Sequence, residues 1–166
     1  MKCPDCGFEN IAGEEVCESC SASLSSLALP EAKAKQGVQR KILEGSIADL
    51  GVHDAVVVSP QATVAEAVRL MREKKMGCVL VGDARSLLGI CTERDLLMEV
   101  AGLQEPEKLR LSSVMTRDPQ YLRDDHPIAF AFHNMALRNY RHIPILRANG
   151  TFGIVSSRDL LRYLCR

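Results

Sequence analysis

Apolar residues in the last two thirds of the chain follow a pattern that occurs twice, in the same order. Two stretches carry apolar residues at positions i, i+3, i+4 and i+7, which is the spacing of one face of an α-helix. They are Val64, Ala67, Val68 and Met71, and then Ile128, Ala131, Phe132 and Met135. A short run rich in β-forming residues precedes each of them, at 55–58 and at 120–122. The pattern predicts a strand followed by an amphipathic helix, used twice.

Two further apolar runs and a second helix follow in each copy. The runs span residues 78–81 and 88–91 in the first copy and 143–146 and 152–155 in the second, and the last helices begin at Thr92 and Ser156. Each copy thus has the order β-α-β-β-α, which predicts a mixed α/β (α+β) fold. Because a unit of this size is too small to bury a full core alone, we expect the two copies to pack sheet against sheet and share one core.

A constant offset of 64 residues relates the two copies. The segment GICTERDLL at 89–97 recurs as GIVSSRDLL at 153–161, with six of nine residues identical. A gap-free offset of this kind indicates one structural unit used twice. The chain then divides into a cysteine-rich module at 1–24, a linker with a short helix at 25–46, a first repeat at 47–105 and a second repeat at 106–166. Within the linker, Pro30 is a possible first helical residue.

Both final helices start with a hydroxyl residue and an aspartate three positions later, Thr92 with Asp95 and Ser156 with Asp159. One interpretation is a capping box, in which the hydroxyl accepts a backbone N–H and the acid lies near the positive end of the helix dipole. The other is a ligand site, because free N–H groups at a helix start attract phosphate and a carboxylate can bind both hydroxyls of a ribose. The residues alone leave both interpretations open.

The doubled segment resembles the signature of CBS domains, the repeats first named in cystathionine β-synthase. The segments at 59–67 and 141–145 are similar to that family too, so the resemblance covers residues 47–166. It implies a pseudo-two-fold pair of repeats, known as a Bateman module, with two clefts that bind AMP, ADP, ATP or S-adenosylmethionine. It also implies a homodimer, since such modules pair into discs. The sequence contains no Ser/His/Asp or Cys/His set with a plausible oxyanion site and no GxxxxGK(S/T) loop, so we expect a regulatory protein rather than an enzyme.

The resemblance assigns roles residue by residue. Asp95 and Asp159 would hold ribose hydroxyls, and Thr92 and Ser156 would contact phosphate. The other residues that it places beside a ligand are Ile90, Ile154, Val57, Val58, Gly77, Cys78, Tyr121, Arg141, His142 and Arg158.

The two copies differ at the positions that flank the ligand. Gly77-Cys78 carries no charge, whereas Arg141-His142 at the same place in the second copy offers one fixed and one conditional cation. The two clefts are therefore not expected to be equivalent, and one of them could stay empty. The remaining histidines, His53, His126 and His133, lack metal-ligand spacing and are interpreted as surface or satisfied residues.

Four of the seven cysteines lie near the start of the sequence, as two CxxC pairs with ten residues between them. They are Cys3, Cys6, Cys17 and Cys20. Two such pairs predict a closed tetrahedral zinc site of the zinc-ribbon type. So few residues cannot fold on an apolar core, and the metal would supply about 10–16 kcal/mol of folding free energy. An iron–sulfur site, a redox pair and unliganded thiols are the alternatives.

Composition narrows the class of protein further. Apolar residues make up 46% and charged residues 25% of the 166, with no net charge, as in ordinary globular proteins. No apolar run approaches the roughly 18 residues of a membrane span, and no apolar stretch follows the initial MKCP as a secretory signal would require. We therefore expect a cytoplasmic protein without a membrane partner.

Charge along the chain bears on the possible partners of the cysteine-rich module. Residues 1–20 carry one base and five acids, so binding to nucleic acid is not favoured. The module would instead contact a protein partner. A nucleic-acid-associated regulator, with the repeats as scaffold, is the alternative.

Overall fold

The computed structural model describes residues 2–11, 16–22, 24, 37–83, 85–100 and 105–165. The possible helix start at Pro30 lies outside these residues. The helices are α1 (Val38–Glu44), the 3₁₀ helix η1 (Ile47–Leu50), α2 (Val64–Lys74), α3 (Glu93–Val100), α4 (Leu111–Val114), α5 (Ile128–Leu137) and α6 (Ser157–Leu164). The strands are β1 (His53–Asp54), β2 (Val57–Val58), β3 (Cys78–Gly82), β4 (Leu87–Thr92), β5 (Thr116–Arg117), β6 (Leu122–Arg123), β7 (His142–Leu146) and β8 (Phe152–Ser156).

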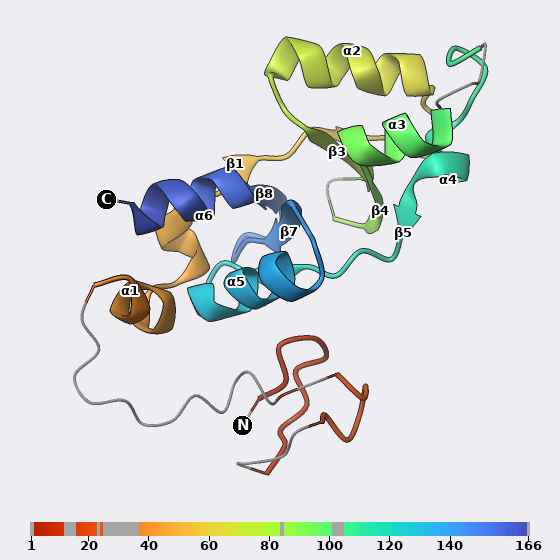
Figure 1. Cartoon of the computed structure of the whole chain (residues 1–166). Coiled ribbons are helices and arrows are strands. Elements are labelled where there is room, and N and C mark those ends of the chain that lie inside the picture. Colours follow the sequence, from red (N-terminus) through yellow and green to blue (C-terminus); the bar gives the residue numbers. More distant parts are fainter. Residues whose placement is uncertain are drawn as a thin grey trace.

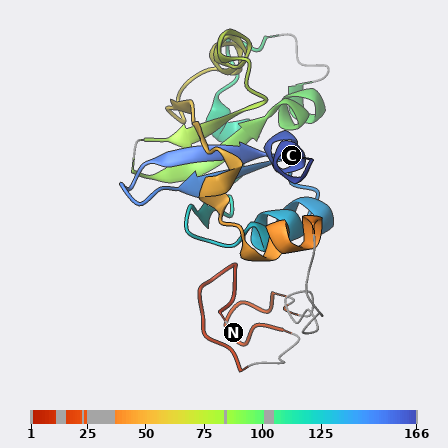
Figure 2. The ribbon, with the colours of Figure 1, turned by 90° about the vertical axis from the view of Figure 1, so that its left-hand side faces the viewer.

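The mixed α/β fold is confirmed, with two four-stranded sheets and helices outside them (Figures 1 and 2). Both predicted amphipathic helices form, as α2 and α5. The start of α2 is fixed by the Thr63 side chain, which accepts a hydrogen bond from the Glu66 N–H at 3.2 Å, as N-capping requires. Val68 and Phe132, the i+4 residues of the two apolar faces, stay exposed, so each helix buries a narrower stripe than its sequence pattern predicts.

Each sheet contains an edge strand from the segment that leads into the other repeat. The strand orders are β2-β3-β4-β5 and β1-β8-β7-β6. Strand β1 lies near the start of the first repeat but pairs antiparallel with β8 of the second. Strand β5 lies near the start of the second repeat but pairs antiparallel with β4 of the first. The run at 55–58, expected to be one strand, forms a strand only at residues 57–58. Residues 53–54, just before this run, belong to the other sheet.

Three clusters of buried apolar residues hold the two repeats together, where the sequence pattern led us to expect one shared core. One cluster, which includes Val64 and Val79, lies between the first sheet and its helices. A second, which includes Ile128 and Ile143, does the same in the second repeat. A third lies between the two sheets and consists of Cys78, Leu80, Ile90 and Ile154 with partly buried neighbours. The alternation of side chains along each strand explains this division, since one face meets the helices and the other meets the opposite sheet.

The short helices at the start of each repeat also pack on the opposite repeat. Ile47 and Leu50 of η1 are buried in the cluster of the second repeat. Leu111 and Val114 of α4 are buried in the cluster of the first. The chain thus crosses between the repeats twice in the same way, and the pseudo-two-fold arrangement includes the connecting segments as well as the sheets.

Strands β1 and β5, which each repeat contributes to the sheet of the other, are called the exchanged strands. Glycines allow them to approach β8 and β4. Gly153 lies opposite Asp54 in the β1–β8 pair, and Gly89 lies opposite Arg117 in the β4–β5 pair. A Cβ at Gly153 would lie 2.4 Å from Cγ1 of Val52 and 2.9 Å from a backbone oxygen. Both contacts are closer than atoms can pack, so a side chain at this position would push β1 away from its sheet.

We expect Gly153→Ala to lower the free energy of unfolding by about 1–3 kcal/mol, the usual cost of overpacking. Gly89→Ala should cost less, because its closest neighbour, at 2.5 Å, is the flexible side chain of Met115. Chemical denaturation followed by circular dichroism measures both values. A loss at Gly89 equal to or larger than that at Gly153 would contradict this account of how β1 is held.

Candidate functional site

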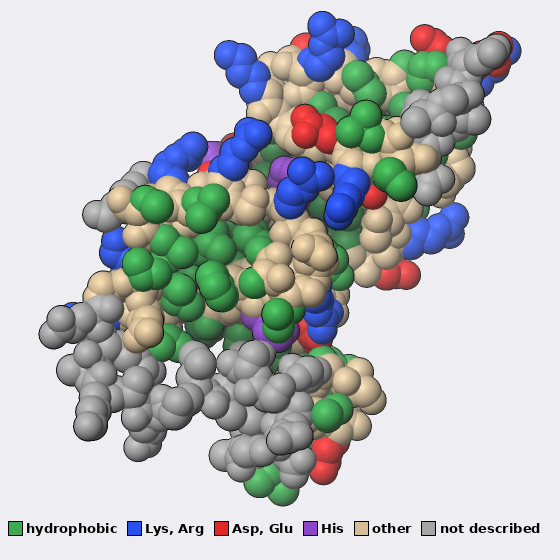
Figure 3. Space-filling view, viewed as in Figure 1, with side chains coloured by type: hydrophobic (Ala, Val, Ile, Leu, Met, Phe, Trp, Pro, Cys, Tyr) green, Lys and Arg blue, Asp and Glu red, His purple; other side chains and the backbone are tan. Residues whose placement is uncertain are grey.

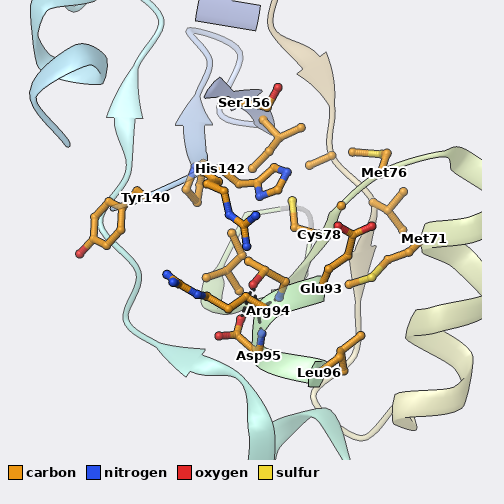
Figure 4. A pocket seen from close by; sticks show the side chains of 18 of the residues that line it. Met71, Met76, Cys78, Glu93, Arg94, Asp95, Leu96, Tyr140, His142 and Ser156 are labelled. Carbon is orange, nitrogen blue, oxygen red and sulfur yellow. Dashed lines mark hydrogen bonds between the residues drawn. The ribbon is translucent and has the colours of Figure 1, made fainter. Parts of the chain in front are cut away.

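A cavity of about 1660 Å³ lies between the two repeats and is lined by residues of both. The resemblance implied two clefts, but both aspartates, Asp95 and Asp159, line this one continuous cavity. Figure 4 shows part of it, with side chains from α3 facing His142 and Tyr140 of the second repeat. The residues predicted from the sequence that line it are Gly77, Cys78, Ile90, Thr92, Asp95, Arg141, His142, Ile154, Ser156, Arg158 and Asp159.

Three residues that the sequence placed beside a ligand lie outside the cavity lining. Val57 pairs with β3 and packs in the cluster between the sheets. Val58 is buried in the cluster of the first repeat. Tyr121 packs edge-on against Phe152, with ring centroids 5.7 Å apart. The strands expected at 55–58 and 120–122 form only at 57–58 and 122–123. The cavity is lined instead by residues that precede these strands, among them His53, Asp54, Ala55, Val56, Thr116, Pro119 and Gln120.

Asp95 caps its own helix with one oxygen only. Its Oδ2 accepts hydrogen bonds from the Thr92 backbone N–H at 2.8 Å and from the Thr92 hydroxyl at 2.9 Å. Among the described residues, none donates a hydrogen bond to Oδ1. The capping and ligand interpretations are therefore compatible, because a carboxylate has two oxygens and the cap uses only one.

Asp159 has the same cap but a different environment. Its Oδ2 accepts from the Ser156 N–H at 2.8 Å and from the Ser156 hydroxyl at 2.6 Å. Its Oδ1 lies 3.0 Å from Nε2 of His53 and 3.5 Å from a guanidinium nitrogen of Arg162. Burial by itself raises the pKa of Asp159, but the hydrogen bonds from Ser156 and His53 outweigh it, and the pKa lies below its ordinary value. Asp159 is thus an ionised carboxylate with both oxygens engaged.

His142 of the second repeat reaches across to Gly77 of the first. A Cβ at Gly77 would lie 2.9 Å from Nε2 of His142, so the imidazole occupies the space that a side chain there would need. Burial lowers the pKa of His142, Glu93 opposes this shift and Arg141 reinforces it. The imidazole is therefore neutral at pH 7 and can both donate and accept a hydrogen bond.

Basic side chains predominate around the cavity. Among the residues described, eight basic side chains line it against four acidic ones, and Figure 3 shows several Lys and Arg side chains between α3 and α6. Arg94, Arg141 and Arg158 form no ion pair with any described residue. Uncompensated cations around a concave surface favour an anionic ligand.

The four predicted metal ligands converge in the N-terminal module, residues 2–24. The sulfurs of Cys3, Cys6, Cys17 and Cys20 all lie within 4.8 Å of one another. Cys3 and Cys20 are 3.6 Å apart, as are Cys6 and Cys17. Tetrahedral coordination with metal–sulfur bonds of about 2.3 Å requires sulfurs about 3.8 Å apart. The arrangement therefore fits one tetrahedral metal ion.

Sequence reasoning missed Asn10, which links the segment after the first CxxC pair to the second pair. Its side chain is buried and donates to the Phe8 carbonyl at 3.1 Å and to Sγ of Cys17 at 3.5 Å. Its Oδ1 accepts from the Glu18 N–H at 3.0 Å. The sequence itself shows only an asparagine between two cysteine pairs, without its burial or its partners.

A partly buried ion pair connects this module to the second repeat. Asp5, inside the first CxxC pair, lies 2.5 Å from a guanidinium nitrogen of Arg138 at the end of α5. The Asp5 side chain is only 8% exposed. Arg138 also donates to the Gln120 side chain, and both Arg138 and Gln120 line the cavity. The module therefore contacts the rim of the cavity itself.

A model of the CBS domain family matches residues 47–102 and 111–166. The chain belongs to the CBS domain family and carries a pair of CBS domains. Residues 1–46 lie outside the match, and no described helix is long and apolar enough to cross a lipid bilayer.

Relatives and solved structures agree with this assignment. An uncharacterised 17.7 kDa protein of Acidianus ambivalens is 33% identical over 122 residues, which cover 71% of this chain and 72% of that protein. The crystal structure of a CBS-domain-containing protein from Agrobacterium tumefaciens is similar with a TM-score of 0.61 and 30% identity, covering 70% of this chain and 94% of that one. The structure of CBSX2 in complex with AMP is similar with a TM-score of 0.59 and 25% identity, covering 70% and 93%.

We expect Arg138→Ala to loosen the N-terminal module, because it leaves the buried Asp5 carboxylate without its partner. Hydrogen exchange of residues 2–11 in the intact protein should rise. Asp5→Ala should have a smaller effect, and the double variant should resemble Asp5→Ala, with a coupling of about 0.5–3 kcal/mol. Additive effects in the double variant would show that the two side chains do not interact in solution.

Proposed function

We propose that the protein is a regulatory sensor that binds an adenine nucleotide in the cavity between its CBS domains. One observation carries this proposal: Asp95 lines a cavity with many basic residues, and its Oδ1 accepts no hydrogen bond from any described residue while Oδ2 fixes the carboxylate in place. A fixed carboxylate suits two vicinal ribose hydroxyls, and the adjacent helix start suits phosphate. The AMP found in the similar structure of CBSX2 supports the same class of ligand.

The charge of the cavity favours AMP, ADP or ATP over S-adenosylmethionine. The eight basic side chains attract phosphate, whereas the sulfonium ligand carries a positive charge at the corresponding end. The apolar side chains of Ile90 and Ile154, which also line the cavity, offer a surface for the adenine ring. A nucleotide phosphate would lie near Arg94, Arg141 and Arg158, which form no ion pair with any described residue.

We also propose that the four cysteines bind one structural Zn²⁺ ion. Their sulfurs fit a tetrahedral site with four protein ligands, which leaves no open position for catalysis. Bound there, the ion supplies the folding free energy that the small apolar content of this module cannot. The module would serve as a docking element for a protein partner.

Nucleotide binding would change how this module is presented. Arg138 lines the cavity and pairs with Asp5 of the module. A phosphate group near Arg138 would compete with the Asp5 carboxylate for the same guanidinium. The position of the module would then depend on whether the cavity is filled.

We also propose a homodimer, which apolar surface repeated in both CBS domains supports. Val68 and Phe132 are exposed at equivalent positions of α2 and α5, and Leu97 and Leu161 are exposed at equivalent positions of α3 and α6. Figure 3 shows the apolar side chains of the second repeat gathered over α5 and α6. A second copy related by two-fold symmetry could cover both sets at once, as in the discs formed by paired CBS modules.

We expect the protein to bind AMP in isothermal titration calorimetry, and Asp95→Ala to weaken binding at least about tenfold, the loss expected for hydrogen bonds to a charged group. The matched control is Asp49→Ala. Asp49 makes the same capping contacts with Ser46, at 2.8 and 3.0 Å, but does not line the cavity. Equal effects of the two variants on binding would mean that Asp95 acts only as a cap, and no binding of AMP or ATP at millimolar concentration would refute the proposed function.

We expect Asn10→Ala to lower the affinity for Zn²⁺ about tenfold to a hundredfold, as is usual when a residue that orients metal ligands is removed. The reason is that Asn10 donates to the Cys17 sulfur and accepts from the Glu18 N–H, which orients the second cysteine pair. Competition with a chromogenic chelator measures the affinity, and Asn149→Ala, in a distant exposed turn, is the control. Zinc affinity unchanged by Asn10→Ala would show that the cysteines alone order the site.

A further inference from the structure

The register of the exchanged strands shows which residues are equivalent around the two aspartates. His53 lies opposite Ile154 in the β1–β8 pair, and Thr116 lies opposite Ile90 in the β4–β5 pair. Ile90 and Ile154 occupy the same position of the two repeats. His53 and Thr116 are therefore structural counterparts, although their separation is one residue short of the repeat offset, so the sequence alignment alone does not pair them.

The longer of these two counterparts reaches its aspartate. Nε2 of His53 lies 3.0 Å from Oδ1 of Asp159. Because an ionised carboxylate can only accept hydrogen bonds, Nε2 must carry the hydrogen. Arg162 approaches the same oxygen at 3.5 Å, and the Asp159 side chain is only 5% exposed. Both of its oxygens are thus occupied by the protein itself.

The shorter counterpart leaves its aspartate open. Thr116 lines the cavity, but no hydrogen bond links it to Asp95 among the described residues. Oδ2 of Asp95 accepts hydrogen bonds from Thr92 in the same way as Oδ2 of Asp159 accepts them from Ser156. The two caps are therefore alike. The difference between the two halves of the cavity lies in Oδ1. It comes from His53 against Thr116, with the longer contact of Arg162 as a second contribution.

We propose that His53 is a specificity-determining residue that reserves ribose binding for the Asp95 half of the cavity. This rests on the proposed function, namely that the cavity binds an adenine nucleotide. A nucleotide at Asp159 must first displace the His53 imidazole from Oδ1, whereas a nucleotide at Asp95 displaces no protein group. Since the His53 side chain is 56% exposed, the displaced ring can turn into solvent, so the Asp159 half binds more weakly but is not sealed.

The experiment exchanges the two counterparts and counts bound AMP in the full-length, zinc-loaded protein by calorimetry. The unchanged protein should bind one AMP per chain tightly and a second at least about tenfold more weakly. His53→Thr should strengthen the second site about tenfold to a hundredfold, the effect expected when a hydrogen bond to a charged group no longer has to be broken. Adding Asp159→Ala to His53→Thr should abolish the gain, which assigns the new site to Asp159.

The reciprocal variant excludes a general effect on folding. Thr116→His should weaken the tight site and leave the weak one unchanged, the opposite of His53→Thr. A second site unaffected by His53→Thr, or a tight site that Asp159→Ala removes and Asp95→Ala leaves intact, would overturn this inference while nucleotide binding itself stood. Failure of every variant to bind AMP would overturn both this inference and the proposed function.

Discussion

The pairing of two short edge strands, β1 with β8 and β5 with β4, fixes the arrangement of the whole molecule. Each strand belongs to the segment entering one repeat but completes the sheet of the other. The chain must therefore cross between the sheets just after each strand, and the crossing residues line the cavity. Gly153 and Gly89 make this possible, because a side chain at either position would meet the edge strand or the residue beside it. The cavity exists because the two repeats exchange these strands.

The doubled hydroxyl-x-x-aspartate segment has one structural role and two different surroundings. In both repeats Oδ2 closes the start of a helix. This contact orients the carboxylate and leaves Oδ1 without a bond to its own helix. Whether Oδ1 has a hydrogen-bond partner then depends on the strand that the opposite repeat contributes. A local motif thus places the carboxylate, and a non-local pairing decides whether it is free. The asymmetry that the sequence suggested at Gly77 and Arg141 is real in the cavity lining, but the engaged oxygen of Asp159 is a separate difference.

Local features of the sequence predicted the order of the elements, the two amphipathic helices, both capping segments and the convergence of the four cysteines. These depend on spacing within about ten residues, which periodicity and motifs report directly. The pairing of residues 53–54 with one sheet and of residues 57–58 with the other was not predictable, since β1 pairs with β8, a strand far away in the sequence. Contacts across 106 residues, between His53 and Asp159, and across 133 residues, between Asp5 and Arg138, leave no pattern in one sequence. Val57 and Val58 lie outside the cavity lining because they form strand β2, and Tyr121 because it packs against Phe152.

Arg138 connects the small module with the cavity in a way that neither part requires for its own folding. The CBS pair has its own apolar clusters, and the module is organised around four sulfurs and Asn10. An ion pair with a nearly buried aspartate is weak evidence for stability, because desolvation offsets much of the attraction. A phosphate that takes the guanidinium would leave Asp5 buried and uncompensated, so Asp5 would have to move into water to avoid that cost. Under the proposed function, the module would therefore leave its position when nucleotide binds in the cavity. The surface of the module around Asp5 would then become exposed to a partner.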